Sequence, residues 1–159
     1  MAYYINVYNV YTLKAIIDNY PVKSIKDINN VWDKKSIITT KDKLSLSDVE
    51  HKILRKMGDP RIHFAINCAS FSCPNLLNTA YLPETLDKQL EKAAKSFIND
   101  TSKNNITEKV LNLSEIFNWF AGDFKKNDSL IDFLNKYSIV KIDKNAKIKY
   151  QDYNWSLNK

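Results

Sequence analysis

Apolar residues recur at helical spacing through the first twenty positions, and they predict a helix over residues 3–19. At about 100° per residue, one stripe holds five aliphatic side chains: Ile5, Val10, Leu13, Ile16 and Ile17. Asn6 and Asn9 project into the same stripe, one turn apart. Because a buried amide is costly unless it is hydrogen-bonded, the two asparagines predict a polar network, either structural or close to a site.

A second helix is predicted from Ser47 to about Met57. Residues 47–50 have the pattern of a capping box, in which Ser47 and Glu50 satisfy the first backbone amides. Glu50 also projects into the middle of the helix's apolar face, and His51 lies at the edge of that face. The Glu50 carboxylate therefore completes the cap, pairs with a cation such as Arg61, or belongs to a site.

The rest of the pattern predicts short elements within one α+β domain over residues 1–159, mostly helical, with a small sheet. Residues 62–66 are apolar and β-rich, so they predict a strand of that sheet. The sheet would then carry the central segment, residues 61–76, which contains His63, Cys68 and Cys73. The remaining predicted elements are a hairpin over 37–46 that turns at Lys41 and Asp42, a helix over 83–100, a strand at 110–113, a helix after Ser114, a helix over 128–137, a terminal hairpin over 139–150 and a docked tail at 153–157.

Residues 61–76 gather most of the rare reactive side chains of the chain. Both cysteines, Cys68 and Cys73, lie there, together with His63 and Arg61. A strand that leads into a polar loop is a common way to build a site. We therefore predict a site at the end of this strand, beneath the helices over 3–19 and 47–57. The candidate binding residues are Arg55, Arg61, His63, Asn67, Ser70, Ser72 and Cys73.

Charge and hydropathy exclude some functional classes. The net charge is +6, but the lysines are scattered, whereas a nucleic-acid surface gathers basic residues and usually includes arginine. No nucleic-acid partner is predicted. The chain has no run of about 18 apolar residues and no basic-then-apolar leader, so neither a membrane span nor a signal peptide is predicted. Since lysine is the default cation here, Arg55 and Arg61 predict bidentate pairing with carboxylates.

Motifs along nearly the whole chain match those of one family, in order. They lie at residues 4–9, 20–25, 44–46, 50–55, 59–70, 72–74, 113–117, 119, 123–124 and 153–158. The chain resembles the domain-of-unknown-function 547 family, with Tyr4 where the family usually has tryptophan and Asn154 where it often has aspartate. Family members usually carry more residues before the first motif. The resemblance therefore implies a fragment that lacks a lead-in, which is where a targeting signal would lie, and it implies no activity.

Cysteine chemistry is the leading interpretation of the central loop. Cys68 would be the nucleophile and His51 the base, with Glu50, Asn6 or Asn9 orienting that base. His63 is a poor base, because five extended residues would place it about 16 Å away on the opposite face. Free amides over 69–72 would form an oxyanion hole. These roles predict a cysteine-dependent hydrolase or acyltransferase that acts on an amide, ester or thioester of a peptide or a small acyl substrate.

Two alternatives use the same residues. In the first, the domain is a non-catalytic peptide- or protein-binding module whose cysteines are buried or disulfide-bonded and whose His63 is an interior hydrogen-bonding group. In the second, His51, His63, Cys68 and Cys73 bind zinc, although the histidines are farther apart than in the usual motifs. No other cofactor is predicted, and the pattern carries no signal for oligomeric state or compartment.

Overall fold

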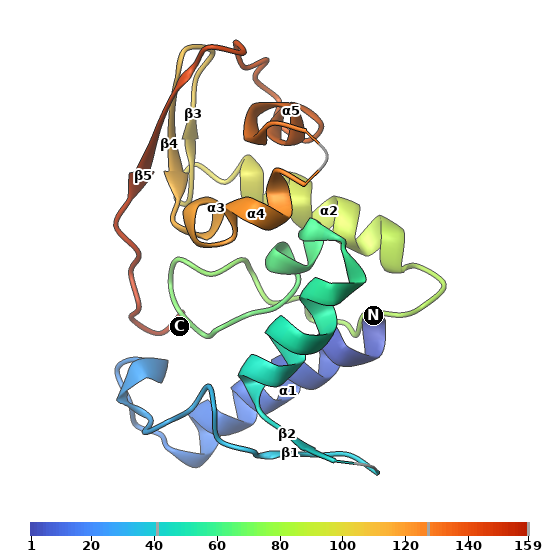
Figure 1. Ribbon diagram of the computed structural model, residues 1–159. Coiled ribbons are helices and arrows are strands. Elements are labelled where there is room, and N and C mark those ends of the chain that lie inside the picture. The colour runs from blue at the N-terminus through green and yellow to red at the C-terminus, as the bar shows by residue number, and fades with distance from the viewer. Residues whose placement is uncertain (41, 127, 159) are drawn as a thin grey trace.

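The interior contains two hydrophobic clusters, the first built mainly from the N-terminal half of the chain and the second mainly from the C-terminal half. The computed structural model describes residues 1–40, 42–126 and 128–158. In the first cluster, α1 (Ala2–Asp18) packs against the π-helical segment η2 (Asp48–Leu54) at the bottom of Figure 1. The 3₁₀ turn η1 (Ile25–Asp27) and the antiparallel hairpin of β1 (Ile37–Ile38) and β2 (Lys43–Leu44) complete this part.

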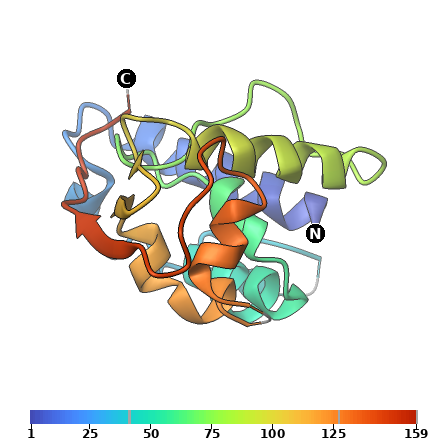
Figure 2. The same ribbon diagram turned by 90° about the horizontal axis from the view of Figure 1, so that it is seen from above.

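The second cluster is built around phenylalanine rings. The ring of Phe64 lies between 5.3 and 6.3 Å from four others, Phe97, Phe117, Phe124 and Phe133. A three-stranded sheet carries part of this cluster: β4 (Val110–Ser114) pairs antiparallel with β3 (Asn105–Ile106) and parallel with β5 (Lys147–Gln151). Figures 1 and 2 show the helices beside it, α2 (Leu86–Ile98), α3 (Ile116–Trp119), α4 (Ala121–Phe124) and α5 (Leu130–Asn135).

The central segment joins the two clusters. After η3 (Arg55–Met57), the left-handed Gly58 turns the chain into the 3₁₀ helix η4 (Pro60–Phe64). Ile62 belongs to the first cluster, whereas Phe64, two residues later, belongs to the second. The C-terminus lies beside the loop that follows η4 (Figure 1), with bridges from Ser70 to Leu157 and from Ser24 to Ser156. The segment is therefore packed between the two halves.

Much of the predicted element order is confirmed, including the α+β class. The first helix, the hairpin strands, α2, β4, α5 and the docked tail all lie within or close to their predicted ranges. The apolar face of α2 is also as predicted, with Leu90, Ala94 and Phe97 buried. Of the predicted hairpin turn, Lys41 lies outside the described residues.

The predicted central strand is wrong. Residues 60–64 form a 3₁₀ helix, because Pro60 occupies its first turn and the Asp59 side chain accepts a hydrogen bond from the Arg61 amide. The small sheet therefore does not carry the central segment. The terminal hairpin is also wrong: β5 pairs with β4 rather than with a strand close in sequence.

Two details of the helices differ from prediction. The capping box lies two residues earlier, where the Ser45 hydroxyl accepts from the Asp48 amide and the Asp48 carboxylate accepts from the Ser45 amide. Glu50 is thereby left free of the cap. On α1, the buried face includes Ile5, Tyr8 and Asn9, whereas much of the predicted aliphatic stripe is exposed, at Val10, Leu13 and Ile17. Hydrogen bonding to the core selects the face with Tyr8 and Asn9 over the more aliphatic one.

Candidate functional site

An aromatic pocket of about 190 Å³ lies where the two halves of the molecule meet. It is lined by residues from α1, η2, η4, α3 and the C-terminal tail, and by residues of the loop that carries Cys68 and Cys73, called the cysteine loop below. All three tryptophans of the chain are among them. Among the described residues, the phenylalanine, tyrosine and tryptophan side chains that line it are Tyr8, Trp32, Trp119, Phe120, Tyr153 and Trp155. Its residues with reactive side chains are Ser47, Glu50, His51, His63, Cys68 and Cys73.

Glu50 is the carboxyl group of this pocket. Burial raises the pKa of Glu50, and the opposing effects of His51 and of the Tyr8 hydroxyl do not cancel that shift. Tyr8 of α1 donates a hydrogen bond of 3.1 Å to Glu50 Oε2. The π-helical hydrogen bonding of η2 places Glu50 and His51 together at the pocket, a use of π-helix that is frequent at functional sites.

His63 is held as an interior histidine. Its side chain is 1% exposed, its Nε2 lies 2.8 Å from Asp123 Oδ2, and its ring stacks on Phe120 at 4.0 Å. Burial lowers the pKa of His63 to about 4, although the Asp123 carboxylate opposes this shift. At neutral pH the contact is therefore a hydrogen bond donated by a neutral imidazole rather than an ion pair. His63 positions Asp123 and Phe120 instead of exchanging protons.

Arg55 also hydrogen-bonds Asp123, the aspartate that His63 contacts. Its Nε and Nη2 donate to the two oxygens of Asp123 at 2.6 and 3.1 Å, which is the bidentate pairing predicted for the arginines. Burial would raise the pKa of Asp123, but the hydrogen bonds from Arg55 and His63 outweigh it and lower that pKa. Arg55 Nη1 also lies 3.4 Å from Nδ1 of His51. The Arg55–Asp123 pair thus joins η3 to α4 behind the pocket.

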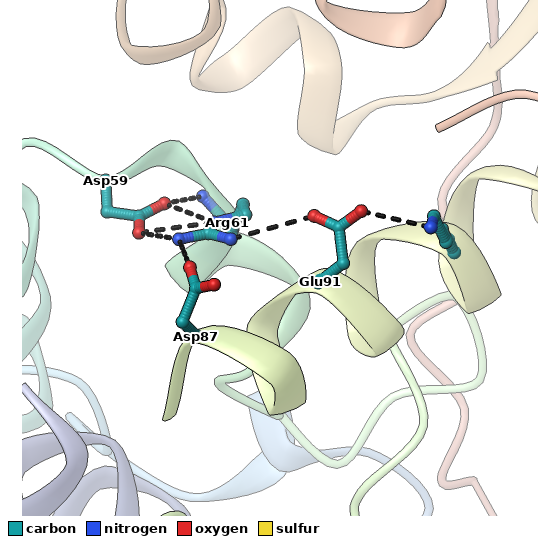
Figure 3. Close-up of polar contacts among 5 residues, drawn as sticks. Asp59, Arg61, Asp87 and Glu91 are labelled. Atoms are coloured by element: carbon teal, nitrogen blue, oxygen red, sulfur yellow. Dashed lines mark hydrogen bonds and ion pairs between the residues drawn. The ribbon is translucent and has the colours of Figure 1, made fainter. Parts of the chain in front are cut away.

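Arg61, a predicted binding residue, is engaged away from the aromatic pocket. Figure 3 shows its guanidinium between Asp59, Asp87 and Glu91. It pairs with both oxygens of Asp59 at 3.0 and 2.8 Å and reaches Asp87 of α2 at 2.8 Å. These contacts connect η4 to α2, and Arg61 is not among the described residues that line the aromatic pocket.

Cys68 and Cys73 form a disulfide in the wall of the pocket. Cys68 is partly exposed, whereas Cys73 is buried. The Cys68 sulfur lies 3.1 Å from the Ser70 hydroxyl and 3.3 Å from the Tyr153 hydroxyl, and the Cys68 amide donates to the Cys73 sulfur at 2.9 Å. The predicted nucleophilic thiol is thus bonded to its neighbour, and His51 and Glu50 line the same pocket.

The loop amides predicted to form an oxyanion hole are largely occupied. The amide of Phe71 donates to Ser156 at 2.7 Å and that of Ser72 to Asn154 at 3.2 Å. The Ser72 hydroxyl in turn accepts from the Asn154 amide at 2.9 Å. These bonds fix the C-terminal tail on the cysteine loop, and the oxyanion-hole prediction is wrong for these amides.

Three asparagines that were candidate site residues hold the backbone in place. Asn6 forms two hydrogen bonds with the backbone of Tyr81, at 2.8 and 2.9 Å. Asn9 donates to the Ala65 carbonyl at 2.9 Å and accepts from the Asn67 amide at 2.8 Å. The Asn67 side chain donates to the Pro74 carbonyl and accepts from the Ala69 amide, both at 2.6 Å. The polar network predicted on α1 exists, and the described contacts of Asn6 and Asn9 are with backbone outside the pocket.

The aromatic wall was missed by sequence reasoning. Trp119, Tyr153 and Trp155 pack together with ring centroids 4.6 to 5.8 Å apart, and Trp32 meets Trp155 at 6.5 Å. The available signals were the aromatic C-terminal tail and Trp32, which lies in otherwise polar surroundings. Neither signal says that residues so far apart in sequence meet.

The described residues contain neither a metal-binding cluster nor a membrane-spanning helix. Among these residues, the structure brings together no group of three or more His, Cys, Asp and Glu side chains that could hold a metal ion. In the described part of the chain, no helix has both the length and the apolar composition needed to cross a bilayer.

Comparison with known proteins identifies the family. The chain belongs to the family described as "Protein of unknown function, DUF547", which matches residues 1–98. No curated protein and no solved structure matches the chain. The family match contains the wall with Tyr8, Glu50 and the disulfide, and it ends before the wall with Trp119, Tyr153 and Trp155.

Proposed function

We propose that this member of the DUF547 family is a non-catalytic binding module. Its aromatic pocket would take one side chain of a peptide or a small molecule of similar size. The observation that carries this proposal is the convergence of all three tryptophans on one pocket that also contains Glu50. Binding sites are typically apolar and aromatic, with few polar groups that fix orientation.

The size of the pocket supports a small occupant. A volume of about 190 Å³ corresponds to roughly six water molecules at about 30 Å³ each. Pockets for drug-sized ligands are larger, about 300 Å³ or more. One side chain or one small head group would therefore fill the space, and the remainder of a peptide would lie on the surface outside.

The internal bonding of the other candidate residues supports binding over catalysis. Cys68 is bonded to Cys73, His63 to Asp123, and Asn9 to the backbone. Each of these groups would have to leave its partner in order to act on a substrate. The rings and Glu50 face the pocket without such a rearrangement, so recognition needs no change in the structure.

Ligand-observed NMR of the oxidised protein tests the proposal. The probes are N-acetyl amino-acid methylamides, one for each standard side chain and one for trimethyllysine, and we expect saturation transfer to a subset of them. The Trp119→Leu variant should lose this transfer, and the Phe71→Leu variant should keep it, since Phe71 is an exposed ring that does not line the pocket. Transfer to no probe, or equal transfer in both variants, would contradict the proposal.

Cysteine-dependent acyl transfer is the second candidate function. One observation favours it: the partly exposed Cys68 sulfur lies within hydrogen-bonding distance of Ser70 and Tyr153, in the same pocket as His51 and Glu50. In the reduced protein these hydroxyls would stabilise a Cys68 thiolate. His51 would take up the Cys68 proton, and the thiolate would attack a carbonyl carbon to form a thioester. His51 would then return that proton to the departing amine, alcohol or thiol. Water would then hydrolyse the thioester.

Alkylation after reduction separates the two candidates. The protein is treated with a phosphine reductant and then with iodoacetamide at pH 6, and the labelled cysteine is identified by peptide mass. Acyl transfer predicts fast labelling of Cys68 and an acetyl adduct on it after p-nitrophenyl acetate. Labelling at the rate of a free thiol, without an adduct, favours the binding module. Zinc in the reduced protein, measured by elemental analysis, would instead support a site at His51, His63, Cys68 and Cys73.

A further inference from the structure

The wall of the pocket differs in charge from the rest of the protein. The chain has 24 lysine and arginine residues and a net charge of +6. Among the described residues that line the pocket there is no lysine and no arginine, and Glu50 is the one acidic residue. His63 stays neutral at neutral pH. Apart from the His51 imidazole, an anionic ligand would therefore meet a carboxylate and the negative faces of aromatic rings, with no lysine or arginine in the described lining to pair with.

Cations already lie against two rings of this wall from outside the pocket. The Lys26 ammonium is 5.2 Å from the ring centre of Trp155, and the Arg55 guanidinium is 5.3 Å from that of Phe120. Neither basic residue lines the pocket. Such distances are within the range in which an aromatic face attracts a cation. A ligand cation inside the pocket would meet the same rings in a more desolvated setting, where this attraction is stronger.

We propose that the occupant of the pocket is a methylated ammonium group, either the head of a small quaternary amine or a trimethylated lysine of a peptide. This inference rests on the proposed binding function and names its ligand class. Glu50 supplies the opposite charge, and Trp119, Trp155 and Tyr153 supply the aromatic surface. The two sources of the group share this chemistry and differ in the part of the ligand that lies outside the pocket.

Methylation of the ammonium follows from the scarcity of acceptors. A primary ammonium has three N–H donors that lose water on entering the pocket. Glu50 Oε2 already accepts from Tyr8, and much of the remaining lining is rings, aliphatic groups and the disulfide. A quaternary ammonium has no N–H to satisfy and presents methyl groups to the rings. Recognition of such groups by several aromatic side chains is a known use of cation–π attraction.

Calorimetric titration with three related probes tests the charge and the methylation separately. The probes are choline, its uncharged carbon analogue 3,3-dimethyl-1-butanol, and ethanolamine. We expect choline to bind at least about tenfold more tightly than either of the other two. Equal affinity for choline and dimethylbutanol would overturn the ammonium inference and leave the binding module intact. Tighter binding of ethanolamine would overturn the methylation. Absence of binding by all three would overturn the ammonium inference, and the separate side-chain panel decides the binding function itself.

A matched variant and a peptide complete the test. Glu50→Gln keeps the shape of the side chain and removes its charge, so choline affinity should fall about tenfold while that of dimethylbutanol stays unchanged. An equal loss for both probes would mean that Glu50 shapes the pocket rather than supplying charge. A short peptide with a trimethylated lysine is compared with its unmodified form. Tighter binding of the peptide than of choline assigns a protein source, and the reverse assigns a small molecule.

Discussion

The two walls of the pocket are built differently. The wall from residues 1–98 contains Glu50, His51, His63 and the disulfide, and hydrogen bonds to Tyr8 and Asp123 fix its polar groups. The described part of the wall from the C-terminal third has no charged side chain and is held by ring packing. The first wall can supply charge and reactivity, and the second supplies apolar contact area. Only the first lies within the family match.

This difference shows how a small domain can combine a fixed polar group with an apolar recognition surface. Arg55 and His63 of the first half both bond Asp123 of the second, and the Tyr153 hydroxyl reaches the cysteine loop. The polar wall is therefore positioned partly by residues from the aromatic side. Substitution of residues that hold both walls in place should therefore lower the free energy of unfolding more than substitution of residues in one wall alone.

Phe64→Ala should have the largest effect, because Phe64 supports the second cluster from within the central segment. Its ring is 1% exposed and contacts four other phenylalanines. The cavity should lower the free energy of unfolding by about 4 kcal/mol. Urea denaturation measures this change. Phe71→Ala, which removes an exposed ring, is the matched control, and a similar loss in both variants would contradict the central role of Phe64.

Acidification should destabilise the protein through His63. The pKa of His63 in the folded state, about 4, lies below its ordinary 6.5, so the unfolded chain takes up a proton first as pH falls. Stability is therefore fully present above about pH 6.5 and decreases down to about pH 4, by roughly 3 kcal/mol at about 1.4 kcal/mol per pH unit. Asp123 and Arg55 face the ring throughout. Urea denaturation at several pH values should show a slope that His63→Gln flattens. An unchanged slope in His63→Gln would refute the assignment.

Reduction of the disulfide should have an intermediate effect on stability. Closing the loop from Cys68 to Cys73 restricts only a short segment of the unfolded chain. The loop-entropy relation gives about 2 kcal/mol for such a loop. The double variant Cys68→Ser, Cys73→Ser should lose this amount in urea denaturation. Thiol titration of the untreated denatured protein should find no free thiol, and two free thiols would contradict the disulfide.

Tyr8→Phe should weaken the polar wall alone. The Tyr8 hydroxyl is buried and donates to Glu50. Its removal should lower the free energy of unfolding by about 1 kcal/mol and leave Glu50 without this donor. Tyr3→Phe, on the exposed side of α1, is the control and should be unchanged within error in the same thermal or urea assay. A loss no greater than the control's would mean that the Tyr8–Glu50 bond contributes nothing to stability.

Trp119→Leu should affect stability least and binding most. The Trp119 side chain is 47% exposed, so its replacement should change the free energy of unfolding by less than about 1 kcal/mol. Its ring forms part of the aromatic wall, so choline affinity should fall about tenfold. Calorimetry together with urea denaturation separates the two effects. Normal affinity in this variant would remove Trp119 from the recognition surface.

Local patterns predicted the elements better than they predicted the contacts between them. The helical periodicity of 83–100 placed α2 correctly, because its apolar face is buried in the two hydrophobic clusters. On α1 the same reasoning selected the wrong face, since Tyr8 and Asn9 gain buried hydrogen bonds that a hydrophobicity pattern does not contain. The apolar run after Pro60 was interpreted as a strand, although proline and Asp59 favour a helical turn there.

The composition of the site was only partly predictable. Of the candidates, Glu50, His51, His63, Cys68 and Cys73 line the pocket. The described lining of the pocket does not include the other candidates, Asn6, Asn9, Arg55, Arg61, Asn67, Ser70 and Ser72. The aromatic wall was not predicted, because it depends on a parallel pairing of β5 with β4 that brings the tail back to the cysteine loop. Such pairing over a long sequence separation leaves no periodic signal in the tail itself.

The most direct test of the account is to follow the three tryptophan indole N–H signals by NMR during a choline titration. Trp32 belongs to the family-matched wall, whereas Trp119 and Trp155 belong to the C-terminal wall. The account predicts that all three signals shift together with a single Kd, and that 3,3-dimethyl-1-butanol shifts them only at concentrations at least about tenfold higher. Signals that move with different Kd values would contradict a single binding pocket formed by both walls, and signals that remain in place would contradict the ammonium inference.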